Sequence, residues 1–152
     1  MPKPLVFLAQ SDTTAGLLSE DFTHLNQIKA RKSYQEILKT LASFKVLKQY
    51  VRVPQKHKNY IRRASKSTFI YPKRASLQSP LALRVVKDFW HQEFLKLMPP
   101  LYSTSANPHK QSFSLDFALQ KADIVVLDKR GIFANKPSKI FKISNYKMRR
   151  VR

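Results

Sequence analysis

The sequence predicts a single α/β domain built on a twisted, mixed β-sheet with flanking helices. Strand-like and helix-like segments alternate along the chain, which is typical of a sheet with helices packed on its faces. The length of 152 residues suits one domain with one core. Hydrophobic residues make up 43% and charged residues 25%, a balance typical of globular proteins. We expect the domain to span residues 1–144 and a basic tail to occupy residues 145–152.

The predicted strands are short runs of apolar, β-branched or aromatic residues bounded by turn residues. Residues 5–9 (LVFLA) end in the small polar run QSDTTAG, which suits a buried strand that leads into a loop. Gly16 closes that loop, and in a chain with only 2 glycines we expect it to allow a close backbone approach. The same reasoning predicts strands over 36–41, 67–72, 81–86, 100–104, 123–128 and 138–143.

The predicted helices start at residues that can cap them. Between residues 87 and 98, aromatic and aliphatic residues form a broad apolar face, and Pro99 and Pro100 end the helix. Three further helices are expected over 23–30 with Asp21 or Thr23 as cap, 44–51 with Ser43, and 114–122 with Ser112 or Ser114.

The charge balance favours a polyanionic partner. The chain has 29 Lys and Arg against 9 Asp and Glu, a net charge of +20, and a pI near 10.5. A field of that sign attracts nucleic acids, and the cations gather at 29–32, at 56–63 and at the C-terminal end. We therefore expect contact with tRNA or double-stranded RNA. A small anionic ligand is the alternative.

Several classes of protein are disfavoured by composition. The absence of cysteine excludes disulfides and thiolate metal sites, and the 4 histidines show no ligand spacing, so we expect no metal site in the protein itself. No apolar run is long enough for a membrane span, and the first residues lack the pattern of a secretory signal. We expect a cytoplasmic protein without a membrane partner.

Small polar loops carry the candidate chemistry. They follow predicted strands and read QSDTTAG, STSANP and KPSK, and the cationic run KARKS follows the first helix. No nucleophile elbow, phosphate-binding glycine loop or dinucleotide fingerprint occurs. If the strand ends face one crevice, these loops converge there and suit the binding of phosphate groups.

Five short motifs occur in order: QSDTTAGL at 10–17, KAR at 29–31, LALR at 81–84, STSAN at 103–107 and PSKI at 137–140. This set resembles the YrdC/TsaC family of threonylcarbamoyl-AMP synthases, whose patterns read PTDTxYGL, KxR, vAvR, SxN and PSxI. The resemblance spans nearly the whole chain and implies a YrdC-like fold. This chain is a short, divergent example, since Gln10, Ser11 and Ala15 depart from the first motif and ASKST at 64–68 replaces PGPxT.

The resemblance also implies roles for individual residues. Lys29 and Arg31 correspond to the family's catalytic contacts with the ATP phosphates. Residues implied to hold L-threonine are Ser11, Arg84, Ser105 and Ser138. Residues implied to hold ATP are Lys29, Ser33, Asn107 and a C-terminal arginine, Arg149 or Arg150, of which we choose Arg149.

The implied reaction joins L-threonine, bicarbonate and ATP into threonylcarbamoyl-AMP and pyrophosphate, with Mg²⁺ accompanying the ATP. Its product is the precursor of threonylcarbamoyladenosine in tRNA, and other tRNA-modification proteins are implied as partners. The missing motif residues leave two alternatives open. One is a catalytically silent paralogue that binds tRNA or double-stranded RNA, and the other is a nucleotide-binding module that responds to ATP or AMP.

Overall fold

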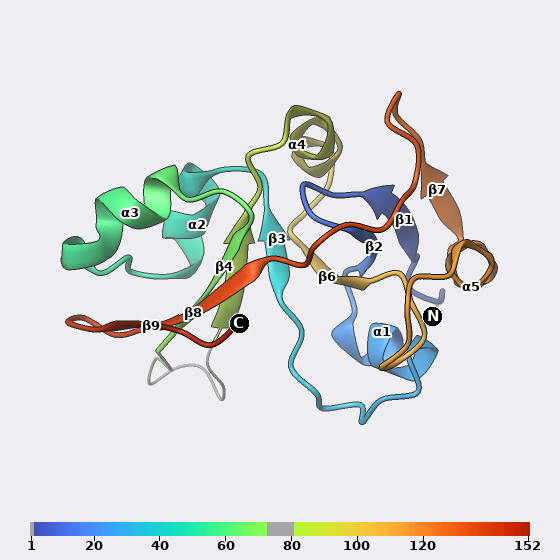
Figure 1. The fold of residues 1–152 in the computed structure, drawn as a ribbon, viewed down its shortest axis with the longest axis horizontal. Coiled ribbons are helices and arrows are strands. Elements are labelled where there is room, and N and C mark those ends of the chain that lie inside the picture. The colour runs from blue at the N-terminus through green and yellow to red at the C-terminus, as the bar shows by residue number, and fades with distance from the viewer. Residues whose placement is uncertain (1, 73–80) are drawn as a thin grey trace.

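The strands form one sheet that runs the length of the molecule (Figure 1). The computed structural model describes residues 2–72 and 81–152. Within this part the sheet is 9-stranded, in the order β7-β1-β2-β6-β3-β5-β4-β8-β9. The strands are β1 (Phe7–Gln10), β2 (Ala15–Ser19), β3 (Lys39–Leu41), β4 (Ser67–Tyr71), β5 (Leu81–Val85), β6 (Leu101–Ser105), β7 (Ile124–Val126), β8 (Lys139–Ile143) and β9 (Met148–Arg150).

The sheet is mixed, as predicted. Strand β1 pairs antiparallel with β2 and parallel with β7, while β3 pairs parallel with β5 and antiparallel with β6. Strand β4 runs antiparallel to β5 and parallel to β8. The helices are α1 (Phe22–Ile28), α2 (Phe44–Tyr50), the 3₁₀ turn η1 (Gln55–His57), α3 (Lys58–Arg63), α4 (Phe89–Lys96) and α5 (Leu115–Lys121). The α/β fold class with flanking helices is therefore confirmed.

At the β9 end of the sheet, alternate side chains of each strand lie on opposite faces, and the two faces have different surroundings. Phe69, Leu83 and Phe141 pack in one buried cluster with residues of α2 and α3. Their neighbours in the strands, Thr68 and Ile140, lie on the other face, because successive strand side chains point in opposite directions. That other face lines a pocket.

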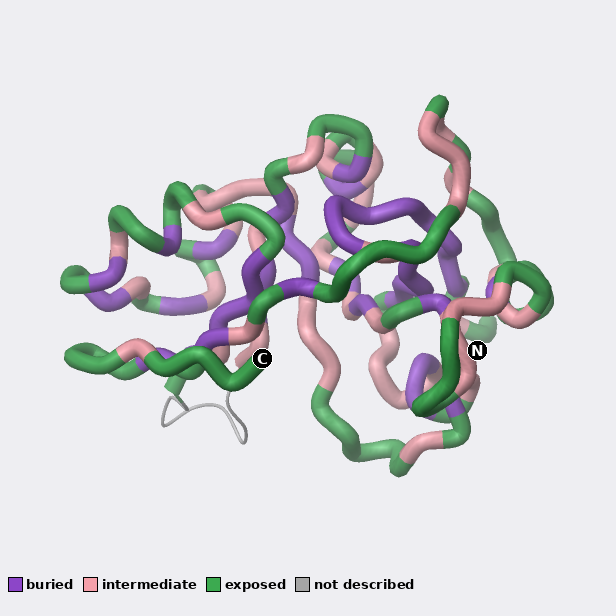
Figure 2. Tube along the Cα trace, in the orientation of Figure 1, coloured by how far each residue is buried: buried purple, intermediate pink, exposed green. Residues whose placement is uncertain are grey.

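Two further clusters hold the β7 end of the molecule. Leu25 of α1 and Ala118 of α5 pack against Leu8 and Leu17. Residues of α4 pack against the opposite face of the same strands. The central strands are consequently buried, whereas the β8–β9 hairpin is largely exposed (Figure 2). No helix in the described ranges is long and apolar enough to span a bilayer.

The predicted elements are recovered with three differences. Ser43 and Ser114 cap α2 and α5 as expected, and Asp21 caps α1. The segment after β1 was predicted to be only a loop, but it continues into strand β2, which contains Gly16. A side chain at Gly16 would approach Ser103 Oγ to 3.2 Å, so the expected close approach is present.

The other two differences concern basic segments. The run 56–63, noted only for its charge, forms the end of η1 and helix α3. Residues 145–152, expected to be a tail beyond the domain, contain β9, which pairs antiparallel with β8. The backbone groups of this segment find hydrogen-bond partners in β8. A strand of three residues is too short for its sequence periodicity to predict this pairing.

Candidate functional site

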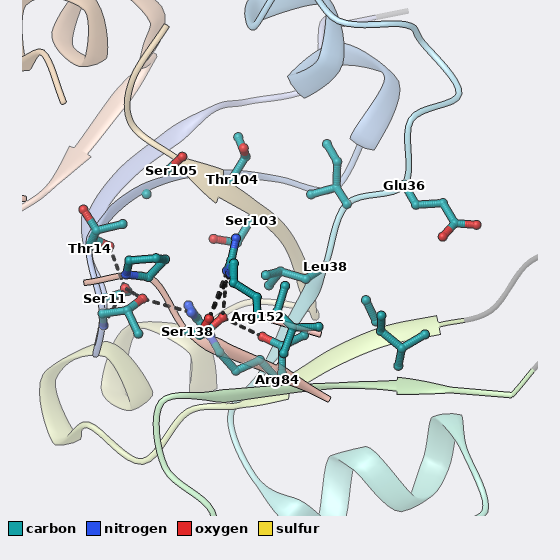
Figure 3. Close-up of a pocket in the computed structure, with 18 of the residues that line it drawn as sticks. Ser11, Thr14, Glu36, Leu38, Arg84, Ser103, Thr104, Ser105, Ser138 and Arg152 are labelled. Carbon is teal, nitrogen blue, oxygen red and sulfur yellow. Dashed lines mark hydrogen bonds between the residues drawn. The ribbon is translucent and has the colours of Figure 1, made fainter. Parts of the chain in front are cut away.

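A pocket of about 350 Å³ opens at the middle of the sheet. It is lined by residues from the β1–β2 turn, the α1–β3 connection, β4, β5, β6 and the segments that flank β8 and β9. Figure 3 shows Ser138 and Arg152 side by side in it, with Arg84 close to them. The volume lies within the range typical of small-molecule sites. The loops predicted to converge therefore meet at one hollow.

The β1–β2 turn presents hydroxyl groups to this pocket. Ser11 Oγ donates to the Thr14 carbonyl oxygen at 2.6 Å and accepts from the Thr13 backbone N–H at 3.0 Å. The Ser11 and Thr13 hydroxyl oxygens also lie 3.0 Å apart. These bonds fix the turn, and Thr13 Oγ1 accepts a hydrogen bond from Arg84 at 3.0 Å.

Arg84 is a buried cation at the base of the pocket, only 4% exposed. Its Nη2 lies 3.6 Å from Asp12 Oδ1, and both side chains are withdrawn from solvent. Burial lowers the pKa of Arg84; the Asp12 carboxylate opposes this and the charge of Arg152 adds to it. Arg84 Nε and both Asp12 carboxylate oxygens have no hydrogen-bond partner within the described residues. Polar groups so placed have unused bonding capacity toward a ligand or water.

Ser138 and Thr68 form a second polar group on the pocket wall. Their hydroxyl oxygens lie 2.9 Å apart. Arg152 donates to the Ser138 carbonyl oxygen from Nε at 3.2 Å and from Nη2 at 3.0 Å, and to Ser138 Oγ at 3.4 Å. Burial lowers the pKa of Arg152. A second guanidinium is thereby fixed over the cavity.

Lys29 lies behind the STSAN segment and holds it. Its Nζ donates to the Ser105 carbonyl oxygen at 2.7 Å, to Ser105 Oγ at 3.5 Å and to Asn107 Oδ1 at 3.4 Å. The Asn107 amide nitrogen in turn donates to the carbonyl oxygens of Pro108 and Gln111, each at 2.8 Å. Burial, and secondly the charge of Arg31, lower the pKa of Lys29 to about 8.

The end of α1 sets the direction of Lys29 and Arg31. Ala30 has a left-handed φ of 52°, and its N–H donates to the Gln27 carbonyl while the Arg31 N–H donates to the Asn26 carbonyl. These two bonds form a Schellman motif, which ends a helix and reverses the chain. Arg31 then reaches the pocket, where its Nη2 donates to Thr104 Oγ1 at 3.2 Å.

The charges that line the pocket are mostly positive. Arg31, Arg84 and Arg152 line it, and Glu36 is its acidic lining residue. Guanidinium groups bind carboxylates and phosphates through paired N–H donors. The arrangement suits an anion with several oxygen atoms, surrounded by hydroxyl groups that can orient its neutral parts.

Comparison with known families identifies the family of the chain. A family model covering Sua5, YciO and YrdC, described as telomere recombination, matches residues 2–152. The chain belongs to the Sua5/YciO/YrdC family. The family resemblance predicted from the motifs is thus confirmed. A search of curated proteins found no match.

Solved structures of the Sua5/YciO/YrdC family share the fold. Escherichia coli YciO superposes with a TM-score of 0.79 at 16% identity, over 98% of this chain and 82% of YciO. P. abyssi Sua5 in complex with L-threonine superposes with a TM-score of 0.78 at 15% identity, over 97% of this chain and 50% of Sua5. The YrdC-like part of full-length HypF, in a phosphate- and nucleotide-bound form, gives 0.76 at 15% identity over 97% of this chain and 26% of HypF. The chain spans about half the length of the Sua5 chains that it matches.

Most residues implied by the family resemblance lie at the pocket. Those that line it are Ser11, Arg31, Arg84, Ser105 and Ser138. Lys29 and Asn107 adjoin it through Ser105, as described above. Their predicted roles toward ATP and L-threonine stay predictions.

Two implied residues lie elsewhere. Ser33 is exposed in the α1–β3 connection, and its carbonyl oxygen accepts from the Asn26 amide at 3.0 Å. Arg149 is exposed on β9, opposite Lys142. Neither residue lines the pocket. Arg152 is the C-terminal arginine that lines the pocket, where its Nη2 donates to the Ser138 carbonyl oxygen.

Thr13, Thr68 and Arg152 are pocket residues that motif reasoning did not choose. Thr13 belongs to the QSDTTAGL segment and Thr68 ends ASKST, so both lie in segments that correspond to motifs of the family. Arg152 could have been found only from the register of β8 and β9. Moving from Arg149 to Arg152 shifts the side chain about 10 Å along an extended chain.

Proposed function

We propose that this protein is an L-threonylcarbamoyl-AMP synthase, a nucleotidyltransferase that uses L-threonine, bicarbonate and ATP and releases pyrophosphate. The observation that carries the proposal is the placement of Arg31, Arg84 and Arg152 around one pocket with the hydroxyls of Ser11 and Ser138. Membership of the Sua5/YciO/YrdC family supports it. The binding of L-threonine by a Sua5 and of nucleotide by a HypF supports the two kinds of ligand.

The substrates divide between the two sides of the pocket. The carboxylate of L-threonine pairs with Arg84, a buried cation that lines the pocket, and its hydroxyl and amine face Ser11, Thr68 and Ser138. The phosphates of ATP face Arg31, with Lys29 moving its ammonium from the Ser105 carbonyl to phosphate oxygen. Arg152 bridges the two sides because it is already fixed on Ser138.

The reaction needs no covalent protein nucleophile. Bicarbonate takes up a proton and loses water to give carbon dioxide. The threonine nitrogen, as the neutral amine, attacks this carbon and releases one proton to solvent, which leaves a carbamate. A carbamate oxygen then attacks the α-phosphorus of ATP, the bond to the bridging oxygen breaks, and pyrophosphate leaves with its electron pair. Fixed positive charge stabilises the phosphate oxygens as their charge increases, and confinement aligns the two reactants.

Magnesium accompanies ATP in this proposal. Mg²⁺ keeps several waters and is commonly held by substrate phosphates with one or two carboxylates. Glu36 lines the pocket and could supply one oxygen ligand. Within the described ranges no group of three acidic or histidine side chains forms a metal site, so the phosphates supply most of the ligands in this proposal.

A silent relative that binds tRNA or double-stranded RNA is the second candidate function. Gln10, which stands where the family pattern has proline, is buried and accepts a hydrogen bond from the Phe133 N–H at 2.9 Å. A proline at this position has no side-chain acceptor and could not make this bond. The net charge of +20 would serve an RNA binder equally well.

Pyrophosphate release from ATP separates these possibilities. We expect release that requires both L-threonine and bicarbonate, and a loss of about a hundredfold in Lys29→Ala, the size typical when one electrostatic contact to a transition state is removed. Asn107→Ala should weaken the reaction because its oxygen accepts from Lys29.

The matched control is Lys121→Ala, an exposed lysine at the end of α5. It removes the same charge away from the pocket and should keep the wild-type rate. If the wild-type protein releases no pyrophosphate in a threonine-dependent manner, the proposal is wrong. Tight RNA binding by that inactive protein would then support the second candidate.

A further inference from the structure

Acidic residues are confined to part of the sequence. No Asp or Glu occurs between Glu36 and Asp88 or after Asp128, although Lys and Arg continue through both segments. Together these segments build β3, β5, β4, β8 and β9, which are adjacent in the sheet, and helices α2 and α3. We call this part the basic end; it lies opposite β7 (Figure 1). A bias in overall composition would place carboxylates at both ends.

Two neighbouring elements of the basic end, helix α3 and the β8–β9 hairpin, expose many of its cations. Tyr60 of α3 packs edge-on against Phe141 of β8, with ring centroids 6.0 Å apart, so the helix and the hairpin are adjacent. None of their exposed cations forms a salt bridge with a described residue. These cations are Arg62, Arg63, Lys139, Lys142, Lys147, Arg149 and Arg150.

The hairpin keeps an unfavourable charge arrangement. Lys142 and Arg149 lie directly opposite each other in the β8–β9 register. Like charges at such a position destabilise a strand pair. An anion bound between them would remove that repulsion.

Protection of the sheet edge does not explain these charges. Charged residues on edge strands often prevent sheets from joining, and β9 is an edge strand. The other edge, β7, instead exposes Ile124 by 42% and Val125 by 38%. Charged side chains are therefore not a general feature of the edge strands of this sheet.

The exposed apolar side chains of α3 and of the segment from β8 to the C-terminus favour RNA over a membrane. Proteins that lie on membranes insert Trp, Phe and Leu side chains, but in these two parts the exposed large side chains are Tyr60 at 52%, Tyr146 at 77% and Val151 at 47%. Tyrosine beside cations is typical of RNA sites, where unpaired bases stack on aromatic rings while phosphates meet Lys and Arg. Duplex DNA offers no unpaired base, and α3, with 6 residues, is too short for a recognition helix.

We propose that α3 and the β8–β9 hairpin form a binding surface for structured RNA. The cations of both elements contact phosphates on either side of the sheet edge, and Tyr146 at the hairpin turn stacks on an unpaired base. The surface is separate from the catalytic proposal, because none of its seven exposed cations lines the pocket. The two proposals can therefore fail independently.

Fluorescence anisotropy of the full chain tests this surface with a tRNA transcript, an RNA duplex, a DNA duplex and vesicles of phosphatidylserine and phosphatidylcholine. The double variant Arg63→Gln/Lys142→Gln removes one cation from each element. The control Lys96→Gln/Lys121→Gln removes the same charge from the ends of α4 and α5. Circular dichroism and thermal unfolding verify that both variants fold.

We expect the surface variant to bind tRNA about tenfold more weakly and to lower the slope of log affinity against log salt by about two. The control should change affinity by less than about twofold. Tyr146→Ala should weaken binding of tRNA about tenfold and leave the RNA duplex unaffected. Equal losses in both double variants, equal affinity for the DNA duplex, or a preference for vesicles would overturn the proposal.

Discussion

At the scale of the residue, the site depends on cations that the fold has partly withdrawn from water. Arg84 is the clearest case, because its buried guanidinium faces a buried carboxylate and a threonine hydroxyl. A buried charge costs free energy unless partners compensate for it. Asp12 and Thr13, both from the β1–β2 turn, supply that compensation and thereby tie the turn to β5.

Lys29 gives a prediction about pH. Its pKa is lowered to about 8, mainly by burial. Raising the pH from about 7 to about 9 should weaken ATP binding several-fold, because a neutral amine no longer attracts phosphate. Isothermal titration calorimetry at three pH values measures this change.

The control for this prediction is Lys29→Arg, which keeps its charge across that range. If ATP binding by the arginine variant weakens with pH at the same midpoint as in the wild type, another group is responsible. Stability should change in the opposite sense. The folded pKa of Lys29 lies below its ordinary value of 10.5, so the unfolded chain binds more protons between about 8 and 10.5 and stability rises with pH there.

At the scale of the element, short connections aim the functional side chains. Helix α1 ends at the Schellman motif that sends Lys29 behind the STSAN segment and Arg31 into the pocket. The antiparallel register of β8 and β9 brings Arg152 to Ser138. Strand period and helix termination thus decide which cations converge.

Ala30 gives a prediction for this motif. Its φ of 52° is a conformation that glycine adopts without the steric cost of a Cβ atom. Ala30→Gly should raise the free energy of unfolding by about 1 kcal/mol, as measured by urea denaturation. The control is Ala122→Gly, at the end of α5, where φ is −83°. Glycine has no such advantage there and should destabilise the protein, and an equal gain in both variants would contradict the explanation.

At the scale of the whole molecule, charge and sheet order are linked. The strands at one end of the sheet come from segments without carboxylates, so the field of the protein is asymmetric as well as positive. Such a field orients an approaching polyanion before contact. The central pocket lies between this end and the end that carries the acidic residues.

Unrelieved repulsion at the basic end leads to a third prediction. Lys142→Gln should raise the free energy of unfolding by about 0.5 kcal/mol at low salt, because it removes one of two opposed like charges. Lys121→Gln should have almost no effect. Urea denaturation at about 0.02 M and about 0.5 M NaCl measures both, and the difference should disappear at high salt. A difference that persists would show that the gain is not electrostatic.

The sequence by itself determined the fold class, most elements and the family. Local signals suffice for these, since caps such as Ser43 and Ser114, apolar runs and short motifs act within a few residues. Ser11, Arg31 and Arg84 could be chosen from those motifs, and they do line one pocket.

Only the tertiary structure decided the remaining features. The second strand, the pairing of β9 in the predicted tail, and the position of Arg152 rather than Arg149 at the pocket follow from strand register, which joins residues far apart in sequence. The separation of charge also became meaningful only when two distant acid-free segments proved to be neighbours in the sheet. Contacts of this kind depend on how the whole chain packs, and no local pattern encodes them.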